Sequence, residues 1–347
     1  MATVEVSAHR LNEPWELGTL RVPNRVLLAP LAGIGNWFVR LQAKRYGAGM
    51  AVSEMVSTHA IHYGNEKTCV EMLRIDPRER EGGPVSIQLF GEDPAMMRSA
   101  AAHVAELGAD AIDINMGCPV AKVCKTGAGA ALLADPDRAV AVARAAVEGA
   151  VAGRGALPVT VKLRSGLRTG ETGGVDLARR LVEEAGVAAI AFHPRSAAVQ
   201  HKGVPDYALA ARLVASLEAP VILTGGLSDA ARVREAFSQT GASAVMLARG
   251  ALGNPWLFAE LVAGREQAPT REEVVDELQW TIERAVEHLG EPRATRYLRK
   301  FYPWYLARLQ MDAHSAKHLQ ALLQQSETLG DVRRLLQAHP ATLALAV

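Results

Sequence analysis

The chain has 347 residues, of which 49% are hydrophobic, and its 38 basic and 37 acidic residues leave a formal net charge of +1. This length suits one large barrel-type domain with an appendage. Because the net charge is nearly neutral, the protein as a whole does not attract nucleic acid or membranes electrostatically, so any basic binding surface must be local. No apolar run approaches the roughly 20 residues that span a bilayer, and nothing in residues 1–12 resembles a signal peptide. The sparse cysteines suggest no disulfide framework, so we expect a protein of the reduced cytoplasm. We also expect a monomer.

Short, mostly apolar segments of five or six residues recur along the first 250 residues. Such segments are typical of strands that are buried on both faces of a parallel sheet. The expected strands are Arg25–Pro30, Met50–Glu54, Pro84–Leu89, Asp110–Asn115, Pro158–Leu163, Ala188–His193, Pro220–Thr224 and Ser243–Leu247.

Helix start and stop signals lie between these segments. Asp93-Pro94, Asp135-Pro136, Ser228 and Asn254-Pro255 begin expected helices, and Gly108, Gly241 and Gly264 end three of them. A capping side chain accepts a hydrogen bond from a backbone amide of the first turn. Proline is tolerated in that turn because it has no amide N–H that needs a partner. Glycine tolerates the left-handed backbone conformation in which many helices end. Alternating strands and helices predict a (β/α)8 TIM barrel over residues 1–265 rather than an open doubly wound sheet, whose first turn would usually be glycine-rich.

Strand signals stop at Pro269, and the remainder predicts an all-helical domain over residues 266–347. Its helices are expected near 271–290 and 291–310, with a third towards the C-terminus. The stretch 293–308 interleaves aromatic residues with cations, namely Arg293, Arg296, Arg299, Lys300 and Arg308. Cations of this kind bind RNA phosphates, whereas the aromatic residues could either pack the core or stack on bases.

Polar residues and glycine turns follow most of the expected strands. Barrel enzymes build their sites at these carboxyl ends, so the side chains should converge on one mouth. The glycine turn at 224–226, with Arg249 after the last strand, is typical of a phosphate site. These features favour a phosphorylated cofactor, and flavin mononucleotide (FMN) fits the size.

Seven segments in the same order resemble the flavin-dependent tRNA-dihydrouridine synthases. They are LLAPLAG (27–33), SIQLFG (86–91), IDINMGCPVAKVCKTGAGAALL (112–133), VKLRSG (161–166), FHPRS (192–196), VILTGGL (221–227) and MLARGALGNPW (246–256). The likeness covers about residues 20–265, with a looser helical match beyond. Thr224-Gly-Gly and His193-Pro-Arg depart from the more usual Asn-Gly-Asp or Asn-Gly-Gly and His-Gly-Arg.

The resemblance implies an FMN enzyme that reduces the C5–C6 double bond of particular uridines in tRNA, with NADPH or NADH as reductant. It assigns the flavin to Pro30, Leu31, Ala32, Gln88, Lys162 and His193, and the phosphate to Thr224, Gly225, Gly226, Ala248 and Arg249. It assigns the substrate to Asn115, Arg164 and Arg195 in the barrel, and we add Arg293, Arg296, Arg299 and Lys300 in the helices. No metal site is expected, because no His/Cys set with zinc-ligand spacing is present.

The three cysteines are Cys69, Cys118 and Cys124. Cys69 has no supporting context. From its position after a strand end, Cys118 should face the mouth, and a protonated thiol could serve as general acid there. The family signature instead places the acid in the following loop, which favours Cys124 and leaves Cys118 as the second candidate.

Two other classes of function fit parts of this pattern. A flavin barrel oxidoreductase acting on a free small molecule, of dihydroorotate or dihydropyrimidine type, would share the phosphate site but has little use for basic helices. A phosphosugar aldolase or isomerase, or a non-catalytic RNA-binding relic, would not hold a flavin.

Overall fold

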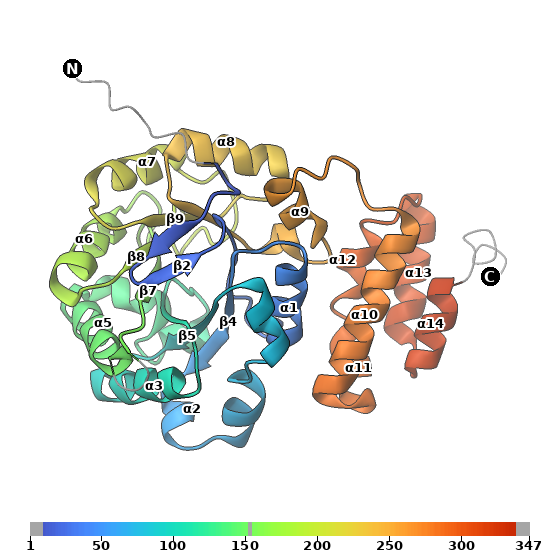
Figure 1. Ribbon diagram of the computed structural model, residues 1–347, viewed down its shortest axis with the longest axis horizontal. Coiled ribbons are helices and arrows are strands. Elements are labelled where there is room, and N and C mark those ends of the chain that lie inside the picture. The colour runs from blue at the N-terminus through green and yellow to red at the C-terminus, as the bar shows by residue number, and fades with distance from the viewer. Residues whose placement is uncertain (1–9, 152–154, 338–347) are drawn as a thin grey trace.

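The computed structural model describes residues 10–151 and 155–337 of the chain. Eight parallel strands close into a barrel in the order β10-β3-β4-β5-β6-β7-β8-β9. Figure 1 shows this barrel beside the C-terminal helices. Their bounds confirm all eight expected strands: β3 Val26–Leu28, β4 Met50–Ser57, β5 Val85–Phe90, β6 Ala111–Met116, β7 Val159–Arg164, β8 Ala189–His193, β9 Val221–Thr224 and β10 Ala244–Leu247. The fold is a TIM barrel.

Helices surround the strands in an outer ring (Figure 1). The ring consists of α1 Trp37–Arg45, α3 Pro94–Glu106, α5 Pro136–Ala150, α6 Gly173–Ala185, α7 Tyr207–Ser216, α8 Ala230–Thr240 and α9 Trp256–Val262. The expected caps of α3 and α5 are confirmed, because Asp93 and Asp135 accept hydrogen bonds from the amides of Met96 and Arg138. At α8 the cap is Asp229 rather than the neighbouring Ser228.

Shorter helical segments lie in the loops that connect these elements. They are α2 Thr58–His62, η1 Lys67–Met72, η2 Pro77–Gly82, α4 Ala121–Cys124, η3 Gly129–Ala134 and η4 Arg249–Ala251. The η2 segment is tied to α1 by a fully buried ion pair, in which Arg40 Nε and Nη2 donate to the two carboxylate oxygens of Glu79 at 2.8 and 3.0 Å.

An antiparallel hairpin that the sequence patterns did not predict precedes the barrel. It joins β1 (Trp15–Leu17) to β2 (Leu20–Val22). Its buried side chains pack in one cluster with barrel residues that include Met50 and Ala189, at the starts of their strands. At its turn, Gly18 lies against Pro158 and Ala188. The hairpin therefore closes the N-terminal end of the barrel.

The C-terminal region is helical, as expected, and lies beside α1 and α9 (Figure 1). It consists of α10 Arg271–Leu289, α11 Glu291–Leu298, α12 Tyr302–Leu306, α13 Ala313–Gln325 and α14 Leu329–Gln337. The single helix expected over 291–310 is wrong: a turn at 299–301 divides it, and Pro303 lies in the first turn of α12, where its missing amide costs no hydrogen bond.

A buried polar cluster joins this region to the barrel. The side-chain amide nitrogen of Gln42, on α1, lies 2.8 Å from Glu277 Oε1, 3.0 Å from Thr281 Oγ1 and 2.7 Å from Tyr305 Oη, and its two N–H groups are shared among these oxygens. Because each of these groups is buried and partnered, the cluster fixes how α10 and α12 sit on α1. Within the described residues, no helix is long and apolar enough to cross a membrane.

Candidate functional site

A cavity of about 750 Å³ opens at the carboxyl ends of the strands. Residues on or just after all eight barrel strands line it, which is the usual location of a TIM-barrel site. The lining includes every barrel residue that the sequence suggested for cofactor or substrate, namely Pro30, Leu31, Ala32, Gln88, Asn115, Lys162, Arg164, His193, Arg195, Thr224, Gly225, Gly226, Ala248 and Arg249.

The turn after β9 brings backbone close to the cavity. Gly225 and Gly226 have φ values of +100° and +80°, and a Cβ at Gly225 would lie 2.4 Å from the His193 ring. Tyr207 Oη donates to the Gly225 carbonyl at 3.0 Å, which holds the turn in place. With Arg249 also lining the cavity, exposed amides and a cation meet here, and both suit a phosphate. The hydroxyl of Thr224 is engaged elsewhere, donating to Met246 O at 3.0 Å.

A chain of hydrogen bonds begins at a buried carboxylate beneath the cavity. Asp113 is fully buried on β6 and accepts from Gln88 Nε2 at 2.6 Å and from Thr160 Oγ1 at 2.5 Å. Gln88 Oε1 accepts from Asn115 Nδ2 at 3.2 Å, and Asn115 Oδ1 accepts from the amide of Cys118 at 2.9 Å. Because an ionised carboxylate only accepts, this chain fixes which way both amides face. Burial raises the pKa of Asp113 to about 6, an effect that the two donors oppose.

Three cationic side chains and one histidine share the adjoining wall, which is formed by the ends of β7 and β8. Burial, and then the charge of Arg164, lower the pKa of Lys162 to about 8. Burial lowers the pKa of Arg164 to about 10, and its guanidinium donates to the Gly117 carbonyl at 2.8 Å. Burial also lowers the pKa of His193 far below its usual range, with the nearby cations acting in the same direction, so this imidazole is neutral.

Arg195 completes this wall. Its Nη2 donates to Gly203 O at 2.6 Å, whereas its buried Nε has no hydrogen-bond partner among the described residues. A buried donor without a partner is costly, so this atom favours an acceptor supplied by a ligand.

The two neighbouring cysteines lie in different surroundings. Cys118 lines the cavity, where its thiol lies close enough to Lys162 and Arg164 to interact with their charges. Cys124 ends α4 outside the cavity lining, and its Sγ donates to the Cys118 carbonyl at 3.3 Å. The structure therefore brings Cys118, and not Cys124, directly to the cavity, while one carbonyl group links the two residues.

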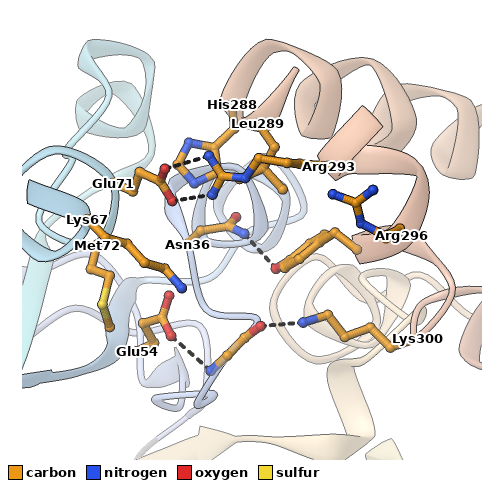
Figure 2. Close-up of a pocket in the computed structure, with 12 residues that line it drawn as sticks. Asn36, Glu54, Lys67, Glu71, Met72, His288, Leu289, Arg293, Arg296 and Lys300 are labelled. Atoms are coloured by element: carbon orange, nitrogen blue, oxygen red, sulfur yellow. Dashed lines mark hydrogen bonds and ion pairs between the residues drawn. The ribbon is translucent and has the colours of Figure 1, made fainter. Parts of the chain in front are cut away.

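A second cavity, of about 450 Å³, lies between the barrel and the C-terminal helices. Figure 2 shows Arg293 paired with Glu71 through two hydrogen bonds of 2.7 Å, and Lys300 directed towards the loop that follows β3. Arg296 lines the same cavity and is exposed, with no hydrogen bond or ion pair to any described residue. Arg299 is directed elsewhere and donates to Ser326 O at 3.3 Å.

The sequence did not predict that several further residues would lie at the barrel cavity. Asp113 and Thr160 lie beneath the cavity, while His201 and Arg308 line it. A charged residue at an alternate position of an otherwise apolar strand, as in DAIDIN (110–115), could have identified Asp113. No sequence rule would have placed Arg308, which comes from the C-terminal region. Within the described residues, no group of three or more potential metal ligands is present.

Comparisons with known proteins agree with this architecture. Among solved structures, the chain is similar to morphinone reductase, with a TM-score of 0.55 and 18% identity over 76% of this chain and 93% of that one, which shows a shared fold. It is 37% identical to tRNA-dihydrouridine synthase B of Pseudomonas aeruginosa over 84% of this chain and 87% of that protein. It is 32% identical to tRNA-dihydrouridine synthase B of Shewanella oneidensis over 93% of this chain and 98% of that protein.

The family model described as "Dihydrouridine synthase (Dus)" matches residues 27–343, which include the barrel strands and the described C-terminal helices. The chain therefore belongs to the dihydrouridine synthase family.

Proposed function

We propose that this enzyme reduces the C5–C6 double bond of specific uridines in tRNA to 5,6-dihydrouridine, with FMN as cofactor and NADPH or NADH as reductant. The observation that carries the proposal is the composition of the barrel cavity, which combines a phosphate-type turn, an ordered amide pair and cations in one site. Residues 1–265 would form the catalytic barrel, and residues 266–347 the helical tRNA-binding domain.

The residues of the cavity fit an FMN molecule. The turn at Gly225 and Gly226 and the side chain of Arg249 would hold the phosphate. Pro30, Leu31 and Ala32 offer apolar surface and backbone to a flat ring system, and Gln88 would bond its edge.

The proposed chemistry divides between cofactor and protein. When bound in this cavity, reduced FMN would supply the hydride for C6 of uracil. Cys124 donates its thiol proton to C5, which leaves a thiolate that regains a proton from solvent. Lys162 stabilises negative charge on the ring system, while Asn115, Arg164 and Arg195 hold the base, which must be flipped out of the folded RNA to reach the mouth.

Cys124 is favoured over Cys118 as the acid because the family signature places the acid in the loop after the Gly-Cys-Pro turn, where Cys124 lies. The Cys124 thiol donates a hydrogen bond at the edge of the same turn. Its loop would have to shift for Sγ to reach a base in the cavity, and base binding is the event that we expect to bring it there.

The helical domain would bind the body of the tRNA. Arg296 is the best placed of the four helical cations, since it is exposed beside the second cavity and free of protein partners among the described residues. It can therefore bind a phosphate without breaking an existing contact.

Two experiments test this function. The purified protein should be yellow and should release FMN on denaturation; a colourless protein that fails to take up FMN would refute the proposal. Cys124→Ala should retain FMN but form no dihydrouridine in unmodified tRNA, whereas Cys118→Ala should keep measurable activity. If only Cys118→Ala is inactive, the acid is Cys118. Activity on a free pyrimidine but not on tRNA would favour the small-molecule alternative.

A further inference from the structure

The loop over residues 30–36, which we call the β3–α1 loop, forms the wall between the two cavities. Leu31 and Ile34 line the barrel cavity, whereas Gly33 and Asn36 line the cavity beside the C-terminal helices. A displacement of this loop would change the apolar surface presented to the proposed flavin. The contacts that hold this loop in place should therefore affect the affinity for the cofactor.

The loop is held from both sides. On the barrel side, Glu54 lies on β4, and its carboxylate accepts a hydrogen bond from the amide of Gly33 at 2.9 Å. On the helical side, Lys300 Nζ donates to the carbonyl of the same Gly33 at 2.5 Å, and Figure 2 draws the bonds of Glu54 and Lys300 as dashed lines. One peptide segment is thus clamped between an anion of the barrel and a cation of the helices.

A tyrosine of α11 adds a second attachment. Tyr297 Oη accepts from Asn36 Nδ2 at 2.6 Å and lies 3.3 Å from Ile34 O, to which it donates. Lys300 Nζ is 3.9 Å from the centroid of the Tyr297 ring, a cation–π contact that orients both side chains. The same Asn36 caps α1 by accepting from the amide of Val39, so the attachment reaches the first helix of the barrel.

We infer that Lys300 and Tyr297 are positioning residues for the cofactor: they hold the β3–α1 loop against the flavin cavity instead of contacting RNA. This inference rests on the proposed flavin site and revises the RNA-binding role that the sequence suggested for Lys300. Residues of α11 and of the turn that follows it thus have two different tasks. Arg296 faces open space and serves RNA, while Lys300 and Tyr297 face the barrel and serve the cofactor.

The test compares Lys300→Met with Arg296→Ala, a matched removal of one nearby cation. FMN affinity is measured by fluorescence titration of the apoprotein, and RNA affinity by gel shift with unmodified tRNA. Lys300→Met should weaken FMN binding about fivefold to tenfold, as expected for loss of one charge-assisted hydrogen bond and its cation–π contact, and should shift the visible absorption band of bound flavin. Arg296→Ala should weaken tRNA binding and leave FMN affinity unchanged.

Two further variants separate positioning from folding. Lys300→Arg keeps a donor near Gly33 and should restore most of the FMN affinity. Tyr297→Phe should reproduce the loss in part at an unchanged Tm. If Lys300→Met binds FMN as the unmodified protein does but loses tRNA affinity, Lys300 is an RNA contact and the inference is overturned. If the unmodified protein itself binds no FMN, the proposed function fails first, and the two failures are thereby distinguished.

Discussion

Replacing Gly225 by alanine should damage the proposed phosphate turn, and its cost can be worked out from the geometry. The residue has a φ of +100°, which alanine adopts only with strain of about 1–3 kcal/mol. The added Cβ would also lie 2.4 Å from the His193 ring. That ring is only 6% exposed and lies 6.2 Å from the ring of His201, so it cannot simply swing into solvent. Overpacking of this kind costs about 1–3 kcal/mol more.

The summed cost of about 2–6 kcal/mol should divide between folding and ligand binding. We expect FMN affinity to fall at least about tenfold, which corresponds to roughly 1.4 kcal/mol, and the remainder to lower the Tm. The assay is fluorescence titration of the apoprotein together with thermal unfolding. Gly186→Ala is the control, because Gly186 has a φ of +74° with no atom within 4 Å of its Cβ position, after the end of α6. Equal FMN affinity in both variants would refute this reasoning, because it would show that the His193 ring can move aside without weakening FMN binding.

Three further predictions concern buried charges. The pKa of Lys162 in the folded protein is about 8, so its positive charge is present below that pH and lost above it. FMN affinity should therefore fall between pH 7 and 9. In Lys162→Met, FMN affinity should not show this decrease with pH. Asp113→Leu leaves the buried donors of Gln88 and Thr160 without their acceptor, at about 1–3 kcal/mol each in urea unfolding, and Asp113→Asn should cost less because its carbonyl still accepts. Glu79→Gln should destabilise the fold by about 3–5 kcal/mol by leaving Arg40 buried and uncompensated, and in chemical denaturation the Arg40→Met/Glu79→Leu pair should recover most of that loss.

The barrel could be predicted from the sequence because most strands are short and mainly apolar, and several are followed by a helix with an aspartate cap. Buried strands such as Val221–Thr224 and Ala244–Leu247 are almost entirely apolar, and aspartate caps such as Asp93 act through contacts within one turn. The candidate site followed from the same logic, since residues at strand ends converge by closure of the barrel alone.

The features that could not be predicted depend on contacts between distant segments. The β1 and β2 strands are three residues each, too short for a periodic signal, and the barrel end that they cover stabilises them. The roles of the helical cations depend on what faces them: Arg293 meets Glu71 and Lys300 meets Gly33, each more than 200 positions away in the chain. A basic stretch read alone cannot separate such contacts from a surface that is free for RNA.

The hairpin at the base of the barrel has a consequence for the order of events in catalysis. It covers one end with Trp15, Leu17 and Val22, so in the part of the chain that the structure describes the barrel cavity opens at the opposite rim. A nicotinamide ring and a flipped uracil would have to use the same entrance, and the two could not occupy the cavity at the same time. The two half-reactions should therefore alternate, with oxidised nicotinamide leaving before the nucleotide enters, and each substrate should act as a competitive inhibitor of the other's half-reaction.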